Sequence, residues 1–323
     1  MVKKILLISL SNIGDVILTF PVLDILRRDF PTAELSLVVG PKVKSLLQDN
    51  PNIQHLYIFE KRQSWWRTIL WIWSLRRERF DLVVDLRNTA IPFFLGARRC
   101  TSPFLRRVKG QHMRLQHLNR LWSVYPFERT ADQRFGFYSS FEAHRAIDGI
   151  IQSVVGLGEQ IVVVAPGAAD RGKRWQATEF ARLCDKMIKQ YGVKVVLVGD
   201  SNDKPVVAEV CLKMAEKAVD LSGQLTLAQL GLLLLKAKLL ITNDSASLHL
   251  ASYLNIPTLV IFGPTDPKRY GPWAMRSSVV ERKISCPACQ SGSRRMRHEC
   301  LEKVQAEDVL DMFQLKDGVV TFS

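Results

Sequence analysis

The feature that most constrains the fold of this sequence is a series of short apolar runs, each followed by a stretch with helical periodicity. The runs cover residues 2–9, 34–40, 81–86, 161–165, 193–199, 239–242 and 258–262. After the third run the pattern is interrupted, and it starts again at Gln160. Apolar strands that alternate with helices are typical of parallel sheets with helices on both faces. The sequence therefore predicts an α/β fold with two parallel sheets.

The chain length favours two domains over one. A single hydrophobic core rarely grows beyond ~250–300 residues, and the chain has 323 residues. We place the boundary between the two series of strands, which gives domains 1–155 and 156–323. In this scheme the last helix is able to pack back on the first domain.

Several helix boundaries are marked by capping residues. Residues 17–30 predict one helix with a basic end. Thr178 is the predicted N-cap of another helix, which Gly192 closes, and Thr226 begins a leucine-rich helix.

Charge and composition narrow the choice of partners. The chain has 45 basic and 31 acidic residues, a net charge of +14, which favours anionic ligands such as nucleic acids, acidic lipids or phosphorylated compounds. No run reaches the ~18–20 apolar residues of a membrane-spanning helix. The apolar run near the N-terminus ends at Ser9 and is too short for a signal peptide. We therefore expect a cytoplasmic protein whose isolated cysteines are reduced.

Residues 65–73 are rich in tryptophan and precede a group of charged residues. A stretch of this kind is commonly a core helix. Aromatic and basic residues also suit the surface of a membrane. The sequence leaves both interpretations open.

The turn after the first strand holds the first candidate site, Ser11, Asn12, Gly14 and Asp15. In open α/β sheets, ligands bind beyond the carboxyl ends of the strands. A carboxylate there acts as a general base when it reaches an attacking hydroxyl. The alternative is an ordinary acidic residue that the dipole of the following helix stabilises. The sequence contains neither a G-x-G-x-x-G nor a Walker motif, so the usual dinucleotide and phosphate loops are not supported.

Two further candidate sites follow strands of the second half. Lys173 and Arg174 lie in a loop that opens with small residues, where positive charge suits a diphosphate. Asp244, Ser245 and His249 lie at the predicted start of a helix, whose free N–H groups favour an anion. Ser245 and His249 are four residues apart and share one helix face. The alternatives are a solvated basic loop and a capped helix with an incidental histidine.

Four late residues form a candidate metal site: Cys286, Cys289, His298 and Cys300. Three thiols and an imidazole are able to hold zinc in tetrahedral geometry. The spacing lacks the second C-x2-C pair of common zinc motifs. The favoured interpretation is therefore a reduced cluster that stabilises a loop, with zinc as the alternative.

The order of these motifs, together with a Phe-Gly-Pro-Thr turn over 262–265, resembles glycosyltransferase family 9. This family comprises the ADP-heptose:lipopolysaccharide heptosyltransferases and their relatives. The resemblance extends from Lys4 to about Cys300. It implies a GT-B fold, in which two Rossmann-like domains face a cleft and bind the acceptor and the nucleotide-sugar, respectively.

The resemblance also implies an activity. It is the inverting transfer of a sugar, a heptose from ADP-heptose, to an anionic lipid-linked glycan such as the lipopolysaccharide core. No metal or other cofactor is expected, and peripheral contact with the inner membrane is an open possibility.

Single residues take their roles from the same resemblance. Asp15 matches the general base, and Lys173, with Arg174 beside it, matches the lysine on the donor diphosphate. Ser11, Asn12 and Gly14 belong to the acceptor side or to its turn. The donor-binding residues that the resemblance implies are Asp244, Ser245, His249, Gly263, Pro264 and Thr265.

Two other functions fit parts of the pattern. One is a GT-B enzyme that uses another nucleotide-sugar and acceptor. The other is a non-catalytic nucleic-acid binder, which only the positive net charge supports. The sequence contains no recognisable nucleic-acid motif, so nucleic acid is not an expected partner.

Overall fold

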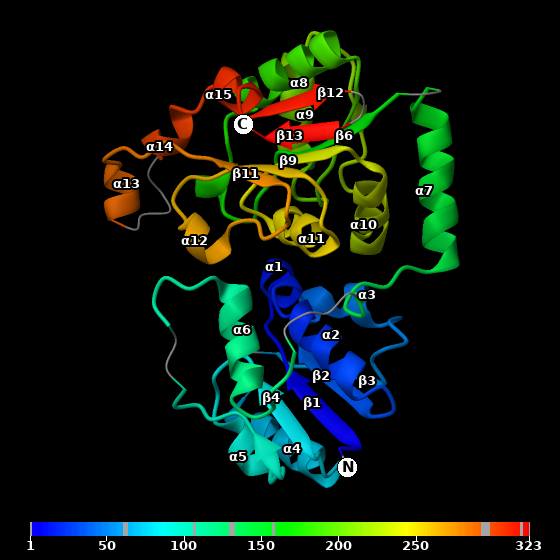
Figure 1. Ribbon diagram of the computed structural model, residues 1–323, viewed down its shortest axis with the longest axis vertical. Coiled ribbons are helices and arrows are strands. Elements are labelled where there is room, and N and C mark those ends of the chain that lie inside the picture. Colours follow the sequence, from blue (N-terminus) through cyan, green and yellow to red (C-terminus); the bar gives the residue numbers. More distant parts are fainter. Residues whose placement is uncertain are drawn as a thin grey trace. The chain divides into compact units, whose positions relative to one another are not determined.

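The computed structural model describes residues 2–60, 64–105, 108–128, 133–156, 159–291, 298–316 and 319–322. The chain forms two compact units, Met1–Tyr138 and Ser139–Ser323, and each contains a parallel sheet (Figure 1). The predicted α/β class is therefore confirmed. The chain divides after Tyr138, earlier than the expected boundary at 155, because helix α7 (Phe141–Val154) packs against α10 (Leu227–Lys236).

The first unit is built on a five-stranded sheet with the order β3-β2-β1-β4-β5. Its strands are β1 (Lys4–Ile8), β2 (Glu34–Val39), β3 (His55–Ile58), β4 (Leu82–Asp85) and β5 (Arg99–Cys100). Its helices are α1 (Ile13–Ile17), α2 (Phe20–Asp29), η1 (Pro41–Val43), α3 (Lys44–Leu47), α4 (Trp65–Arg77), α5 (Ile91–Leu95) and α6 (Met113–Trp122). The chain runs outward from β1 to β3 and then returns to the other side of β1, so the strand order reverses between β1 and β4.

The second unit is built on a six-stranded parallel sheet with the order β11-β10-β9-β6-β7-β8. Its strands are β6 (Ile161–Ala165), β7 (Lys194–Leu197), β8 (Val219–Asp220), β9 (Leu239–Asn243), β10 (Thr258–Ile261) and β11 (Ser277–Val280). Its remaining helices are η2 (Arg171–Lys173), α8 (Ala177–Tyr191), α9 (Lys204–Lys213), α11 (Ala246–Leu254), α12 (Pro267–Tyr270), α13 (Pro287–Gln290), α14 (Glu299–Glu302) and α15 (Ala306–Leu310). Here the order reverses between β6 and β9. The antiparallel hairpin β12 (Phe313–Lys316) and β13 (Val319–Phe322) follows, and α15 packs on α8.

The central strands are apolar because both of their faces are covered. Every residue of β6 is buried, as are four of the five residues of β1. Central parallel strands require such continuous apolar runs, and this is why the sequence locates β6 to the residue.

Two predicted helix starts are wrong in detail. The predicted helix over 17–30 begins later, at Phe20, and Ile17 ends the separate helix α1, because the Thr19 side chain donates to the Val16 carbonyl oxygen at 2.6 Å and Pro21 lacks an N–H to continue α1. Helix α8 begins after Gln176 rather than at Thr178. The predicted end at Gly192, whose φ is +62°, is confirmed, and so is Thr226, which forms a capping box.

Helix α4 is exposed over most of its length and is not a core helix. Only Leu75 is fully buried, whereas Trp66, Ile69, Leu70 and Trp73 are exposed. These four residues are spaced i, i+3, i+4 and i+7 and therefore share one helix face. Helix α4 is thus a surface helix with an uncovered apolar face. Within the described ranges, no helix is long and apolar enough to cross a membrane.

The starts of β1 and β4 are joined by the carboxylate of Asp81. Its Oδ2 accepts hydrogen bonds from the backbone N–H groups of Lys3 at 2.7 Å and Lys4 at 3.0 Å. These two N–H groups, with Lys3 the larger contributor, hold the pKa of Asp81 below its ordinary value.

We expect Asp81→Asn to lower the free energy of unfolding at neutral pH by about 1 kcal/mol, allowing for solvent screening. A depressed folded-state pKa gives stability that is present above the unfolded-state pKa and is lost as the pH falls through the folded-state value. Urea unfolding of both proteins should therefore show a difference at pH 7 that shrinks below pH 4. Asp311→Asn, at an exposed position, is the control. A difference that is independent of pH would contradict this assignment.

Candidate functional site

The candidate loops of the second unit follow neighbouring strands. Strands β10, β9, β6 and β7 lie side by side and are parallel, so their carboxyl ends share one edge of the sheet. The loops that begin at 262, 244, 166 and 198 leave the sheet at this edge. Three separate sequence motifs are thereby brought together at the point where the strand order reverses.

Asp244 links these three motifs. Its Oδ2 accepts a hydrogen bond from Lys173 Nζ at 2.6 Å and another from Thr265 Oγ1 at 2.6 Å. The Asp244 side chain is 6% exposed and that of Lys173 is 27% exposed. The lysine side chain is therefore the more accessible of the two to a ligand. An ammonium group has three donors. Lys173 can therefore keep its bond to Asp244 and still donate to an anion.

Asn243 joins the same loops through the backbone. Its Nδ2 donates to the Pro166 carbonyl oxygen at 2.8 Å, and its Oδ1 accepts from the backbone N–H of Trp175 at 3.1 Å. The side chain is fully buried. It therefore fixes both ends of the segment that carries Lys173.

Arg174 braces its own loop. Its Nε donates to the Ala168 carbonyl oxygen at 2.8 Å, and its Nη2 lies 3.4 Å from Asp203 Oδ1. Burial, assisted by the charge of Asp200, raises the pKa of Asp203. A Cβ atom on Gly167 would lie 2.1 Å from Asp203 Cγ, so the loop passes too close to Asp203 for any side chain at this position.

The start of α11 is only partly as predicted. Ser245 occupies the N-cap position, but its side chain makes no capping hydrogen bond, and its Oγ lies 3.1 Å from Thr242 Oγ1. His249 is 5% exposed, and its ring stacks on Trp273 with centroids 5.8 Å apart. The imidazole thus packs inside the unit.

The candidate turn of the first unit lies beyond β1. The side chain of Asn12, at the N-cap position of α1, donates to Asp15 Oδ2 at 2.9 Å. Ser11 packs so closely on Gly40 that a Cβ atom there would lie 2.6 Å from Ser11 Cβ. Gly14 and Asp15 are half-buried in the first turn of α1. The turn therefore holds the Asp15 carboxylate in a defined orientation.

Sequence reasoning missed a group at the end of the neighbouring strand β4. Buried Arg120 donates to the carbonyl oxygen of Asp85 at 2.7 Å, to Asn88 Oδ1 at 2.6 Å and to the carbonyl oxygen of Ser102 at 3.1 Å. The polar run that follows β4 was the available signal. The group borders a pocket whose lining includes Leu86, Gln111, Gln116, His117, Asn119 and Arg120. Its lining also includes the apolar side chains of Leu105, Val108 and Met113, so the pocket is mixed in character.

The four late metal-site candidates also come together. Their ligand atoms lie within 4.8 Å of one another. Cys289 Sγ is 3.4 Å from His298 Nδ1 and 3.5 Å from Cys300 Sγ. This compact arrangement is compatible with both interpretations of the sequence, a reduced cluster that stabilises a loop and a zinc site.

Comparisons with known proteins agree with this architecture. The model of glycosyltransferase family 9 (heptosyltransferase) matches residues 128–299. Lipopolysaccharide heptosyltransferase 3 of Escherichia coli is 27% identical over 293 residues, which cover 81% of this chain and 84% of that protein.

Solved structures show the same fold over nearly the whole chain. The crystal structure of the glycosyltransferase family 9 protein from Veillonella parvula has a TM-score of 0.79 at 24% identity and covers 95% of both chains. ADP-heptose lps heptosyltransferase II of E. coli has a TM-score of 0.73 at 21% identity, covering 95% of this chain and 96% of that one. The predicted GT-B fold is thus confirmed, and the chain is a glycosyltransferase that belongs to glycosyltransferase family 9.

Proposed function

We propose that this enzyme transfers a heptose from ADP-heptose to an anionic, lipid-linked glycan of the lipopolysaccharide core type. The Lys173–Asp244 pair carries the proposal, because it lies where the strand order of the second sheet reverses. Ligands of open α/β sheets bind at such a point. The donor and acceptor classes come from the relatives, which are a lipopolysaccharide heptosyltransferase and an ADP-heptose lps heptosyltransferase.

The second unit binds the donor in this proposal. The diphosphate of the nucleotide-sugar accepts hydrogen bonds from Lys173 Nζ and lies near the first turn of α11. Helix N-termini and ammonium groups both stabilise phosphate charge. Asp244 is already bonded to Lys173 and Thr265. The loop therefore presents cationic and N–H groups to the leaving phosphate, and no catalytic metal is needed.

The first unit binds the acceptor. Asp15 removes the proton of the acceptor hydroxyl as its oxygen attacks the anomeric carbon from the face opposite the ADP group. The bond between that carbon and the diphosphate breaks, ADP leaves, and the anomeric configuration is inverted. Asn12 orients the Asp15 carboxylate. The transfer requires the donor and the acceptor to be bound at the same time.

We expect Asp15→Ala to lower kcat by about 10²–10⁴-fold, the usual contribution of a general base. Its affinity for ADP should stay unchanged, because the donor binds to the other unit. ADP release with a core-glycan acceptor measures the first quantity and calorimetry the second. Asp49→Ala, which removes an exposed carboxylate from the same unit, is the matched control. Full activity of Asp15→Ala would show that Asp15 is not the general base.

We expect Lys173→Ala to weaken ADP binding by about tenfold to hundredfold, the typical loss for a charge-assisted hydrogen bond. Lys189→Ala removes an equal charge from an exposed position of α8 and should bind ADP normally. A thermal-shift series with ADP, UDP and GDP tests the nucleotide, since a bound ligand raises Tm. Unchanged affinity in Lys173→Ala would remove this lysine from the diphosphate site. A larger shift with UDP or GDP would favour a different nucleotide-sugar.

The apolar face of α4 is proposed to rest on the cytoplasmic face of the inner membrane, where a lipid-linked acceptor resides. Trp66 and Trp73 are 49% and 61% exposed, and Phe93 and Phe94 on the adjoining helix α5 are also exposed. Helix α4 contains three arginines and no acidic residue. Anionic lipids complement this charge, and aromatic side chains suit the interface.

We expect the double variant Trp66→Ser/Trp73→Ser to bind phosphatidylglycerol-containing vesicles at least about tenfold more weakly than the parent, because two exposed aromatic side chains that would insert into the membrane surface are lost. Vesicle sedimentation measures the binding. The control, Leu212→Ser/Met275→Ser, removes two highly exposed apolar side chains from the other unit and should bind like the parent. Equal binding of both double variants would refute α4 as the contact.

A further inference from the structure

We propose that Cys286, Cys289, His298 and Cys300 form a structural zinc site in the second unit. The site takes no part in sugar transfer. Its role is to hold the segment that supports the loop carrying Lys173.

Two of the distances between ligand atoms are close to those around one tetrahedral ion. Zinc with Zn–S bonds of about 2.3 Å and a Zn–N bond of about 2.0–2.1 Å separates its ligand atoms by roughly 3.6–3.8 Å. Cys289 Sγ lies 3.5 Å from Cys300 Sγ and 3.4 Å from His298 Nδ1, and all four ligand atoms lie within 4.8 Å of one another. A disulfide has sulfurs about 2.05 Å apart, so the cysteines are free thiols.

The chemistry of the ligands favours zinc. Thiolates favour Zn²⁺, Cu(I) and iron–sulfur clusters, whereas imidazole suits Zn²⁺ and other divalent transition metals. Three thiolates with one imidazole are a common structural zinc set. Cys286, His298 and Cys300 are buried. Four protein ligands fill the coordination shell and leave no position for water or substrate, as in structural rather than catalytic sites.

The site adjoins the loop that carries Lys173. A Cβ atom on Gly172 would lie 2.8 Å from His298 Nε2, so the imidazole packs directly on the turn before Lys173. If Nδ1 binds the metal, the opposite edge of the same ring faces that turn. Leu301, one residue beyond Cys300, packs against Gly263 on the neighbouring loop.

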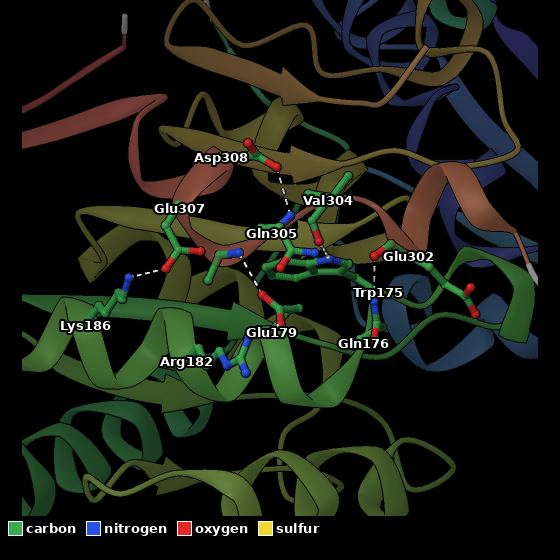
Figure 2. Close-up of polar contacts among 11 residues, drawn as sticks. Trp175, Gln176, Glu179, Arg182, Lys186, Glu302, Val304, Gln305, Glu307 and Asp308 are labelled. Atoms are coloured by element: carbon green, nitrogen blue, oxygen red, sulfur yellow. Dashed lines mark hydrogen bonds and ion pairs between the residues drawn. The ribbon is translucent and has the colours of Figure 1, made fainter. Parts of the chain in front are cut away.

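The residues after the site are tied to the start of α8. Trp175 Nε1 donates to the Val304 carbonyl oxygen at 2.9 Å, and Gln176 Nε2 donates to that of Glu302 at 2.8 Å (Figure 2). The backbone N–H of residue 306 donates to Glu179 Oε2 at 2.9 Å. An ion bound by these four side chains would therefore fix both the turn at Gly172 and the segment that holds Trp175.

The test is the metal content of the full chain, purified under reducing conditions and measured by mass spectrometry of its elements. We expect one zinc ion per chain, which a mercurial thiol reagent should release. Cys286→Ser and Cys300→Ser should lower the zinc content by about tenfold or more, because each loses a ligand. Cys211→Ser, which changes a half-buried cysteine on α9, should keep it.

A second measurement does not depend on the variants folding. Metal-stripped wild-type protein should take up one ZnCl2 equivalent from a chromophoric zinc indicator and gain in Tm, and Co²⁺ in its place should give the visible bands of a tetrahedral thiolate site. Wild-type protein that neither contains nor takes up zinc would overturn the proposal. Iron in place of zinc would overturn the identity of the metal, and equal zinc in Cys286→Ser would overturn the ligand set.

Discussion

The parallel pairing of β6 with β9 is the constraint on which the second unit depends. Ala165 lies opposite Thr242 in the register, so the loops that follow β6 and β9 leave the sheet at the same edge, and the Asn243 amide donates to the Pro166 carbonyl oxygen. Because these strands come from distant parts of the chain, no local interaction brings their loops together. The sheet does so, and the Lys173–Asp244 contact follows from it.

Much of the fold could be predicted because its signals are local. Strand β6 was located to the residue, since a β-branched run is bounded by Gln160 and Pro166. The edge strand β11 was missed, because a half-buried strand that begins with two serines has no apolar run. The break between α1 and α2 was also missed. A threonine followed two residues later by a proline is compatible with a helix start as well as with a helix boundary.

Some residues of the candidate site could likewise be predicted from the sequence, and others could not. The loops with Asp15, Lys173 and Asp244 could be found because each begins where an apolar run ends. Asp203 and Arg120 were missed because their partners are set by strand order. The exposure of α4 was undecidable for a related reason. Helical periodicity identifies apolar positions, but only the packed structure shows that Leu75 is covered and Trp73 is not.

The contact between Lys173 and Asp244 has a consequence for any anion that binds there. A free lysine side chain loses roughly 1.5–2 kcal/mol of conformational entropy when it is immobilised. Here a carboxylate of the same unit immobilises the ammonium group at 2.6 Å during folding. The ammonium group is therefore preorganised, and the entropic cost of ordering it lowers the stability of the protein rather than its affinity for a ligand.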